Sequence, residues 1–273
     1  MALNSDFEKD RKAENTDLVS IIIATHNRED FLDQAIASVL AQTHQNFELI
    51  IIDDGSSDGP KPYLQNSRAP IKYYYQQNRG IAGARNSGVL KAEGDYILFL
   101  DDDDCLFEYA VEYALQKINE DNLHQIVYSD MMIIDEKNQF YGLNIGRRLP
   151  SGDIFLAVVH KHITIRCSGL FLRKKCFNHC LFNEQIKAGE DTEFNIRMAE
   201  KYRYKFVEKP LVKYRIRRLS GEKTLKKKVF SDKKNIVLRY HTITRARGYR
   251  SPARREKINI ISRHLGNIGL YYA

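Results

Sequence analysis

Short apolar runs alternate with amphipathic segments along the first half of the chain. The apolar runs predict buried strands at residues 19–24, 47–52, 71–75, 96–100 and 125–134. Between them, apolar residues recur at helical spacing, which predicts helices at residues 31–41, 80–92 and 106–118. Strands and helices that alternate in this way are typical of βαβ units. We therefore predict an α/β fold, with a mostly parallel, Rossmann-like sheet and helices on both of its faces.

The second half of the chain has a less regular pattern. It predicts a strand at 168–173, a helix at 191–201 and short strands at 204–208 and 211–217. Beyond Ser220 the apolar positions fit basic helices. We therefore expect one large domain, residues 18–220, between a polar arm of residues 1–17 and a basic helical extension of residues 221–273.

Polar clusters follow three of the predicted strands. They are Thr25-His26-Asn27, Asp53-Asp54 and the run from Asp101 to Asp104. Ligands of open parallel sheets bind beyond the carboxyl ends of the strands. We therefore expect the three clusters to meet in one crevice, although they are far apart in the sequence.

The four consecutive aspartates are the strongest candidate for chemistry. Mg²⁺ and Mn²⁺ prefer hard oxygen ligands, and one or two carboxylates are enough to hold such an ion against a diphosphate. In an extended chain Asp101 and Asp103 would point to one side and Asp102 to the other. Asp104 is a candidate cap for a helix that begins near Cys105. The structural alternative is a solvated acidic turn with a helix cap.

Three further positions carry candidate roles. Asp54 can accept a hydrogen bond from a nucleobase or a ribose hydroxyl, and Arg85 can reach a phosphate. Asp191, beside Glu190, can take the proton of an acceptor hydroxyl. The structural alternatives are an aspartate-rich turn, helix–sheet packing around the glycines near Arg85, and a helix N-terminal charge.

Composition and charge limit the function classes. Hydrophobic residues make up 43% of the 273 residues, which excludes a wholly disordered chain. No apolar run approaches the roughly 20 residues of a membrane-spanning helix, and the polar start lacks a signal-peptide core, so we expect a cytoplasmic protein. The net charge is +8, but residues 213–257 alone carry 17 Lys and Arg against 3 Asp and Glu. This basic block suits an anionic membrane surface better than nucleic acid, and the alternative is a solvated helix face.

An ordered set of motifs resembles the family 2 glycosyltransferases of the GT-A fold. The motifs are VSIIIATHNR (19–28), SVLAQT (38–43), FELIIIDDGSSD (47–58), NRGIAGARNSG (78–88), GDYILFLDDDD (94–104) and GED (189–191). The resemblance implies an inverting hexosyl- or N-acetylhexosaminyl-transferase with a nucleotide-sugar donor, usually linked to UDP, and a Mg²⁺ or Mn²⁺ cofactor. It divides the domain into a nucleotide-binding half, 18–135, and an acceptor half, 136–220.

The resemblance also implies roles for individual residues. Asp101 and Asp103 would hold the metal, and Asp191, with Glu190 beside it, would be the catalytic base. The remaining matches would bind the donor nucleotide: Ala24, His26, Asn27, Asp54, Arg85, Asp101 and Asp102. Arg217 stands where the family often has a histidine, which makes it a candidate diphosphate contact. The chain has no Trp and hence no Gln-x-x-Arg-Trp motif of processive synthases, so single-sugar transfer is expected.

We therefore expect a transferase that moves one sugar to a glycan or lipid-linked glycan acceptor, in cell-surface polysaccharide or glycolipid synthesis. The basic extension is a candidate for peripheral contact with an anionic membrane, and nucleic acid is not an expected partner. Two alternatives remain open at this point. One is a non-catalytic, degenerate transferase-like binding domain. The other is a nucleotidyltransferase, although Thr25-His26-Asn27-Arg28 does not supply the glycine-rich loop with a lysine that such enzymes usually need.

Overall fold

The computed structural model describes residues 17–57, 71–144, 149–160 and 162–216. Within these residues nine strands form one sheet, in the order β3-β2-β1-β4-β8-β6-β9-β5, with β7 paired to β6. The strands are β1 Val19–Thr25, β2 Phe47–Asp53, β3 Ile71–Tyr75, β4 Tyr96–Asp101, β5 Cys105–Leu106, β6 His124–Ile134, β7 Phe140–Asn144, β8 Phe171–Arg173 and β9 Arg203–Arg215. The helices are α1 Glu29–Leu40, α3 Gly80–Lys91, α4 Ala110–Asn119, α5 Phe155–Val159, the 3₁₀ helix η1 Lys174–Asn178 and α6 Glu190–Lys201.

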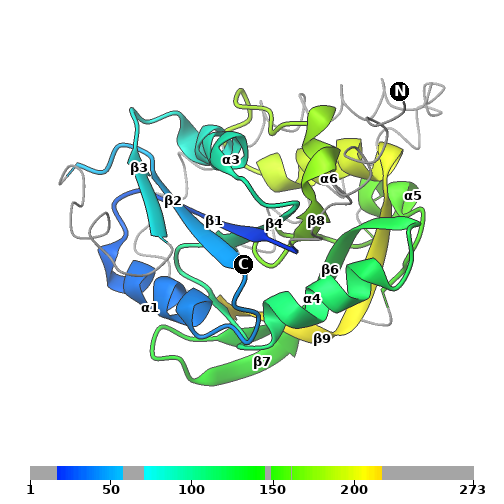
Figure 1. Cartoon of the computed structure of the whole chain (residues 1–273), viewed down its shortest axis with the longest axis horizontal. Coiled ribbons are helices and arrows are strands. Elements are labelled where there is room, and N and C mark those ends of the chain that lie inside the picture. Colours follow the sequence, from blue (N-terminus) through cyan, green and yellow to red (C-terminus); the bar gives the residue numbers. More distant parts are fainter. Residues whose placement is uncertain (1–16, 58–70, 145–148, 161, 217–273) are drawn as a thin grey trace, which may run out of the picture.

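The first half of the sheet is parallel and covered on both faces, as predicted. Strands β3, β2, β1 and β4 run parallel, with β1 in the middle. Alternate side chains of β1 enter different cores, because successive residues of a strand point to opposite faces. Ile21 and Ile23 pack with α1 and α4, whereas Ile22 and Ala24 pack with α3, α5 and α6. Figure 1 shows these two groups of helices on opposite sides of the sheet.

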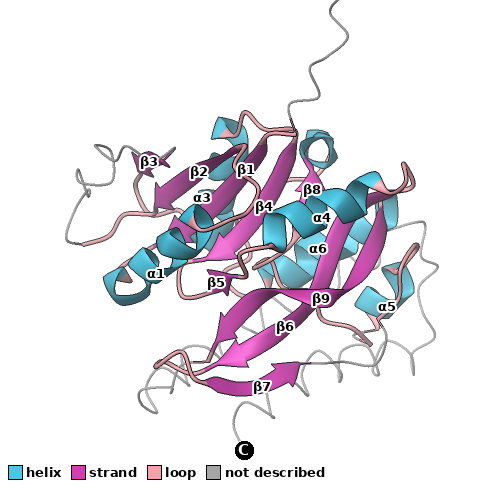
Figure 2. Ribbon diagram, turned by 60° about the horizontal axis from the view of Figure 1, so that its bottom comes forward, coloured by secondary structure: helices cyan, strands magenta, loops and turns pink. Residues whose placement is uncertain are grey.

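The second half of the sheet is mixed. Strand β8 runs antiparallel to both β4 and β6, β7 is antiparallel to β6, and only the β6–β9 pair is parallel. Figure 2 shows β6, β7 and β9 as a group that curls away from the first four strands. The two short strands predicted at 204–208 and 211–217 form the single strand β9. Its register against β6 shifts between Val207 and Val212, and this irregularity accommodates Pro210, which has no N–H to donate.

The predicted start of the third helix, at residue 106, was wrong. Residues 105–106 form the short strand β5, which pairs with β9, and helix α4 begins only at Ala110. Asp104 is therefore not a helix cap. Its buried carboxylate instead accepts the backbone N–H of Arg215 at 2.9 Å, because β9 runs beside the loop that follows β4.

Several expectations fall on parts of the chain outside the described residues. These are the polar arm, the basic helical extension, the candidate membrane contact of that extension and Arg217. Within the described residues, no helix is both long and apolar enough to cross a bilayer.

Candidate functional site

A cavity of about 350 Å³ lies at the carboxyl ends of β1, β2 and β4. Its wall is completed by the start of α3 and the first residue of α6. The lining contains these residues from the sequence prediction: Ala24, His26, Asp54, Arg85, Asp101, Asp102 and Glu190. Asn27, Asp103 and Asp191 lie outside this lining. The three predicted polar clusters thus meet in one crevice, which we call the strand-end cavity.

Asp54 connects the end of β2 to the start of α3. Its Oδ1 accepts the backbone N–H of Arg79 at 2.9 Å, and its Oδ2 accepts that of Gly80 at 2.7 Å. The side chain of Gln76 donates to Oδ1 as well, at 2.7 Å. The first N–H groups of a helix have no partner within the helix, so this carboxylate satisfies two of them and complements the helix dipole. Asp54 is thereby fixed in one orientation at the edge of the cavity.

The aspartate run forms a turn after β4, and its chain does not stay extended. The N–H of Asp104 donates to the carbonyl of Asp101 at 3.1 Å. The turn brings Asp102 and Asp103 to the same partner, Arg28, whose Nη1 lies 2.8 Å from Asp102 Oδ1 and 3.3 Å from Asp103 Oδ2. The alternation expected for an extended chain therefore does not apply, because the chain turns here. Arg28 was given no role from the sequence, although it directly follows the first polar cluster.

Asp102 and Asp104 are the two buried aspartates of this turn, and of the two only Asp102 lines the cavity. Burial raises the pKa of the Asp102 carboxyl group to about 6, against the opposing effect of the Arg28 guanidinium. Asp102 lines the cavity and forms an ion pair with Arg28, which also lines it. In the sequence analysis only the family resemblance assigned it a role, in donor binding, because a run of four identical residues offers no pattern that separates one from another.

Arg85 links the two halves of the domain. Its Nη2 donates to Asp101 Oδ1 at 2.7 Å and its Nη1 to Glu190 Oε1 at 2.8 Å. Only 6% of the Arg85 side chain is exposed, and Glu190 is nearly as buried. Burial raises the pKa of Glu190, and the charge of Arg85 opposes this shift. The guanidinium therefore compensates two carboxylates that come from elements about 90 residues apart in the chain.

A second buried arginine, Arg215, contacts the turn formed by residues 101–104, which we call the acidic turn. Its Nε donates to the carbonyl of Asp103 at 2.7 Å, and its Nη1 donates to Asn138 Oδ1 at 2.7 Å. Its Nη2 donates to Gln34 Oε1 at 3.0 Å. The sequence analysis singled out the neighbouring Arg217 and missed Arg215. A signal was present, because an arginine at the end of an apolar strand needs buried partners.

Asn27 and Asp191 take positions beside the cavity. Asn27 has φ = 54°, a left-handed conformation that asparagine tolerates better than most residues, and its Oδ1 accepts the N–H of Ser57 at 2.7 Å. It thus ties the loop after β1 to the loop after β2. Asp191 lies in the first turn of α6, half-buried, and its Oδ1 accepts the N–H of Thr192 at 2.6 Å.

The donor set at the acidic turn fits a magnesium-type ion. Asp101 and Asp103 supply carboxylate oxygens, and such an ion uses one or two carboxylates and fills its shell with phosphate oxygens and water. No group of three His, Cys, Asp or Glu side chains in the described part of the chain is arranged to hold a metal. The carboxylates of Asp101 and Asp103 are therefore compatible in chemistry with an ion that also binds a phosphorylated ligand.

The chain has an α/β sheet with a cavity at the carboxyl ends of its parallel strands, and the second half of this sheet is mixed. This architecture is that of a GT-A-type protein. The chain belongs to glycosyl transferase family 2, since the model of that family matches residues 20–182, more than half of the sequence. The predicted family and fold class are thereby confirmed.

The relatives include characterised and uncharacterised proteins. An uncharacterised glycosyltransferase of Rickettsia conorii is 36% identical over 204 residues, covering 74% of this chain and 33% of the relative. The minor teichoic acid biosynthesis protein GgaB of Bacillus subtilis is 32% identical over 207 residues, covering 72% and 23%. The GalNAc(5)-diNAcBac-PP-undecaprenol beta-1,3-glucosyltransferase of Campylobacter jejuni is 33% identical over 187 residues, covering 64% and 57%. The chain thus spans about a third of the length of the curated relatives that match first.

Among solved structures, S. aureus TarS 1–349 has the same fold. It superposes with a TM-score of 0.68 at 19% identity, over 93% of this chain and 72% of TarS 1–349. Structures of that TarS fragment in complex with UDP and with UDP-GlcNAc also match, each with a TM-score of 0.63.

Proposed function

We propose that the chain transfers a single sugar, hexosyl or N-acetylhexosaminyl, from a UDP-sugar to a hydroxyl acceptor with inversion at the anomeric carbon. The observation that carries the proposal is the strand-end cavity, bounded on one side by the acidic turn and on the other by Glu190. Arg85 joins Asp101 of the turn to Glu190, so the carboxylates expected at the diphosphate and the expected base at Asp191 belong to adjacent elements.

In this proposal the nucleoside lies between the ends of β1 and β2. Ala24, His26 and Asp54 line this part of the cavity, and Asp54 is already oriented by the first N–H groups of α3. Asp101 and Asp103 would hold Mg²⁺ or Mn²⁺, and the bound ion would neutralise charge on the departing diphosphate.

Asp191 is the proposed general base. Its carboxylate accepts the proton of the acceptor hydroxyl while the hydroxyl oxygen attacks the anomeric carbon from the face opposite the diphosphate. The bond from the anomeric carbon to the diphosphate oxygen breaks in the same displacement, and UDP leaves with the bonding electrons. Glu190, paired with Arg85, has the supporting role of fixing the first turn of α6.

The relatives support the choice of substrates. The family includes proteins named for teichoic acid biosynthesis and for glucosyl transfer to an undecaprenyl-diphosphate-linked glycan, and the TarS fragment binds UDP and UDP-GlcNAc. We therefore propose a glycan or lipid-linked glycan acceptor and a place in cell-surface polysaccharide or glycolipid synthesis. The basic extension would hold the protein at an anionic membrane. Changing Lys226, Lys227 and Lys228 to Gln in the full chain should reduce flotation with anionic liposomes, and unchanged flotation would contradict this contact.

A nucleotide-sugar assay tests the proposal. The full chain with Mn²⁺ is incubated with UDP-glucose, UDP-galactose, UDP-GlcNAc or UDP-GalNAc and a mixture of glycoside acceptors, and UDP release and the anomeric configuration of the product are measured. We expect one donor to be used with inversion. In Asp191→Asn the rate should fall about 10²–10⁴-fold, as is typical when a general base is lost, while UDP binding persists. A product with retained configuration, or full activity of the variant, would overturn the assigned mechanism. Asp33→Asn, on exposed helix surface, is the matched control.

A further inference from the structure

Three arginines from separate elements contact the acidic turn, and one of them differs from the other two. Arg85 of α3 and Arg215 at the end of β9 are buried, and each is also fixed by a partner outside the turn, Glu190 for Arg85 and Asn138 for Arg215. Arg28 comes from the loop between β1 and α1, and its side chain is 40% exposed. Because exposed ion pairs are broken more easily than buried ones, Arg28 is the arginine that can most readily change its contacts.

The backbone that carries Arg28 is held by its neighbours. The N–H of Asn27 donates to Ser56 Oγ at 3.0 Å, and Asn27 Oδ1 accepts the N–H of Ser57 at 2.7 Å. Helix α1 begins at the next residue, Glu29. These contacts do not involve the Arg28 side chain, so a change in what its guanidinium binds requires rotation of that side chain and no rearrangement of the loop.

The two contacts of Arg28 within the acidic turn are unequal. Its Nη1 lies 2.8 Å from Asp102 Oδ1 but 3.3 Å from Asp103 Oδ2. The Asp102 side chain is 3% exposed and the Asp103 side chain 14% exposed. A buried carboxylate depends more on a paired cation, because water does not solvate it. The contact with Asp103 is therefore the weaker of the two, and Asp102 is the anchor of the guanidinium.

Arg28 and a divalent cation have charges of the same sign and would share the carboxylate of Asp103. Like charges a few ångströms apart disfavour each other, so the guanidinium weakens the attraction of the turn for a metal ion that arrives alone. A metal ion that arrives with a nucleoside diphosphate brings negative charge as well. Because Arg28 lines the strand-end cavity, that negative charge would offset the repulsion between the two cations.

We propose that Arg28 is a resident counter-cation of the acidic turn, which competes with a free metal ion for Asp103 and gives up this carboxylate to a metal ion that enters with the nucleotide. During the exchange the guanidinium stays paired with Asp102 at the wall of the strand-end cavity. Metal and nucleotide therefore bind together, and the metal alone binds weakly. The inference rests on the proposed function, because it takes Asp103 as a metal ligand from there.

Removal of the Arg28 charge tests this proposal. Arg28→Gln keeps a hydrogen-bond donor at an exposed loop position, where folding should tolerate the change. Binding of Mn²⁺ to the full chain is followed by electron paramagnetic resonance, which measures free Mn²⁺, without and with UDP. We expect Arg28→Gln to bind Mn²⁺ alone about tenfold more tightly than the unchanged chain, because one nearby charge shifts the protonation of a carboxylate by a similar factor. The factor by which UDP strengthens Mn²⁺ binding should be smaller in the variant.

Three further variants separate competition at Asp103 from a change in net charge. Arg28→Lys keeps the charge and should bind Mn²⁺ like the unchanged chain. Arg79→Gln removes the same charge from an exposed arginine at the start of α3, whose partner is Glu184. It should change Mn²⁺ affinity less than about twofold in 0.15 M salt, which screens distant charges. Adding Asp103→Asn to Arg28→Gln should abolish the gain in affinity.

Three outcomes would overturn the proposal. In the first, Arg28→Gln binds Mn²⁺ no more tightly than the unchanged chain, which includes the case in which neither binds it detectably. In the second, Arg79→Gln gains as much affinity as Arg28→Gln. In the third, the gain survives Asp103→Asn. Because no measurement here needs a sugar or turnover, failure of this proposal is distinguishable from failure of the nucleotide-sugar assay.

Discussion

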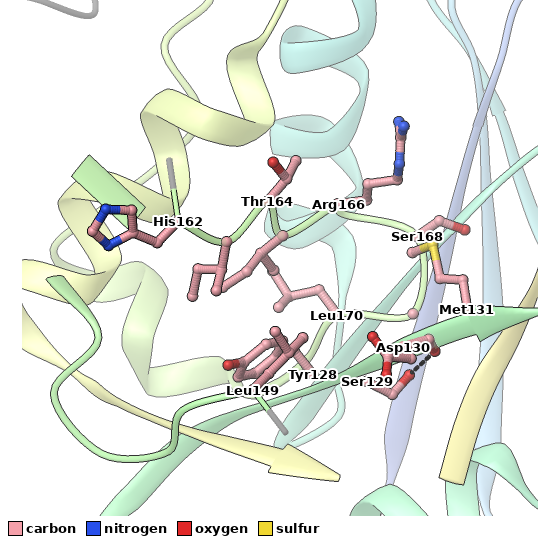
Figure 3. A pocket seen from close by; sticks show the side chains of 13 residues that line it. Tyr128, Ser129, Asp130, Met131, Leu149, His162, Thr164, Arg166, Ser168 and Leu170 are labelled. Carbon is pink, nitrogen blue, oxygen red and sulfur yellow. Dashed lines mark hydrogen bonds between the residues drawn. The ribbon is translucent and has the colours of Figure 1, made fainter. Parts of the chain in front are cut away.

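The two halves of the domain present polar groups to their cavities in different ways. Around the strand-end cavity, Asp54, Asp101 and Asp102 lie at the ends of regular strands, and each is held by a charged or N–H partner. A second cavity, the β6 cavity, lies between residues 128–131 of β6 and the irregular segment 162–170 (Figure 3), whose backbone is tied down, as the Asn195 contact to Ile165 illustrates. The first site is thus ordered by charge pairing and the second by packing, so substitutions in the two should fail for different reasons.

Two ion pairs cross between the halves and allow a direct test of this difference. Arg85 pairs with Glu190, and Arg79 pairs with Glu184, so both arginines of the α3 region reach a glutamate 105 residues later. The Arg85 side chain is 6% exposed and that of Arg79 is 48% exposed. Burial is therefore the main difference between two contacts of the same chemistry.

The largest effect is expected for Arg85→Met. The substitution leaves Glu190 and Asp101 without their shared cation, and breaking a buried ion pair costs about 3–5 kcal/mol. We expect a loss of about 3 kcal/mol, because part of Asp101 remains in contact with water. Urea unfolding followed by circular dichroism measures this change.

A double variant makes that prediction sharper. Adding Glu190→Gln removes one of the two uncompensated charges, so the double variant should be more stable than Arg85→Met alone, by about 1 kcal/mol. If the double variant loses as much stability as Arg85→Met, or loses the sum of the two single losses, the arginine contributes by packing and not by charge. The comparison between the two sites would then lose its basis.

The different origins of the two sites also explain what the sequence could predict. The strands of the parallel half and the aspartates at their ends were predictable, because β-branched apolar runs such as Ile21–Ile23 are buried on both faces. The helices α5 and η1 were missed, since five residues are too few to show helical periodicity. The strand β7 was missed because its Gly and Asn are not typical of strands, unlike the residues of β3, which has the same length. Partners such as Arg28 and Arg215 were missed because their contacts depend on turns and on strand pairing across long sequence separations.

The β6 cavity marks the limit of sequence reasoning most clearly. The sequence HITIR, residues 162–166, contains no residue type that identifies a ligand site, and the segment gains its position from Asn195 and from the pairing of β8 with β4 and β6. By contrast, Asp54 could be proposed as a ligand contact because it follows an apolar strand directly. A site formed by strand ends is visible in the sequence, whereas a site formed by packed loops depends on the whole fold.

Gly169→Ala tests the role of packing in the second half, with a medium effect. Gly169 has φ = 80°, and a Cβ at this position would lie 2.5 Å from Val212 Cγ2. The left-handed conformation alone costs alanine roughly 1–2 kcal/mol, so we expect a loss of about 2 kcal/mol in urea unfolding. Gly152→Ala is the matched control, because Gly152 also has a left-handed backbone, with φ = 91°, and a Cβ there meets nothing within 4 Å. Equal stabilities of the two variants would contradict a packing-limited site.

The smallest effect is expected for Arg79→Met, the exposed counterpart of Arg85→Met. Arg79 donates to both oxygens of Glu184, at 2.6 and 3.2 Å, so its geometry is at least as good as that of the buried pair. Water solvates the Glu184 carboxylate that is left behind, and exposed ion pairs contribute only about 0.2–1 kcal/mol. We therefore expect a loss below about 1 kcal/mol in the same urea experiment, decreasing further in 1 M salt because salt screens exposed charges. A loss as large as that of Arg85→Met would show that bidentate geometry, and not burial, determines how strongly the two halves are joined.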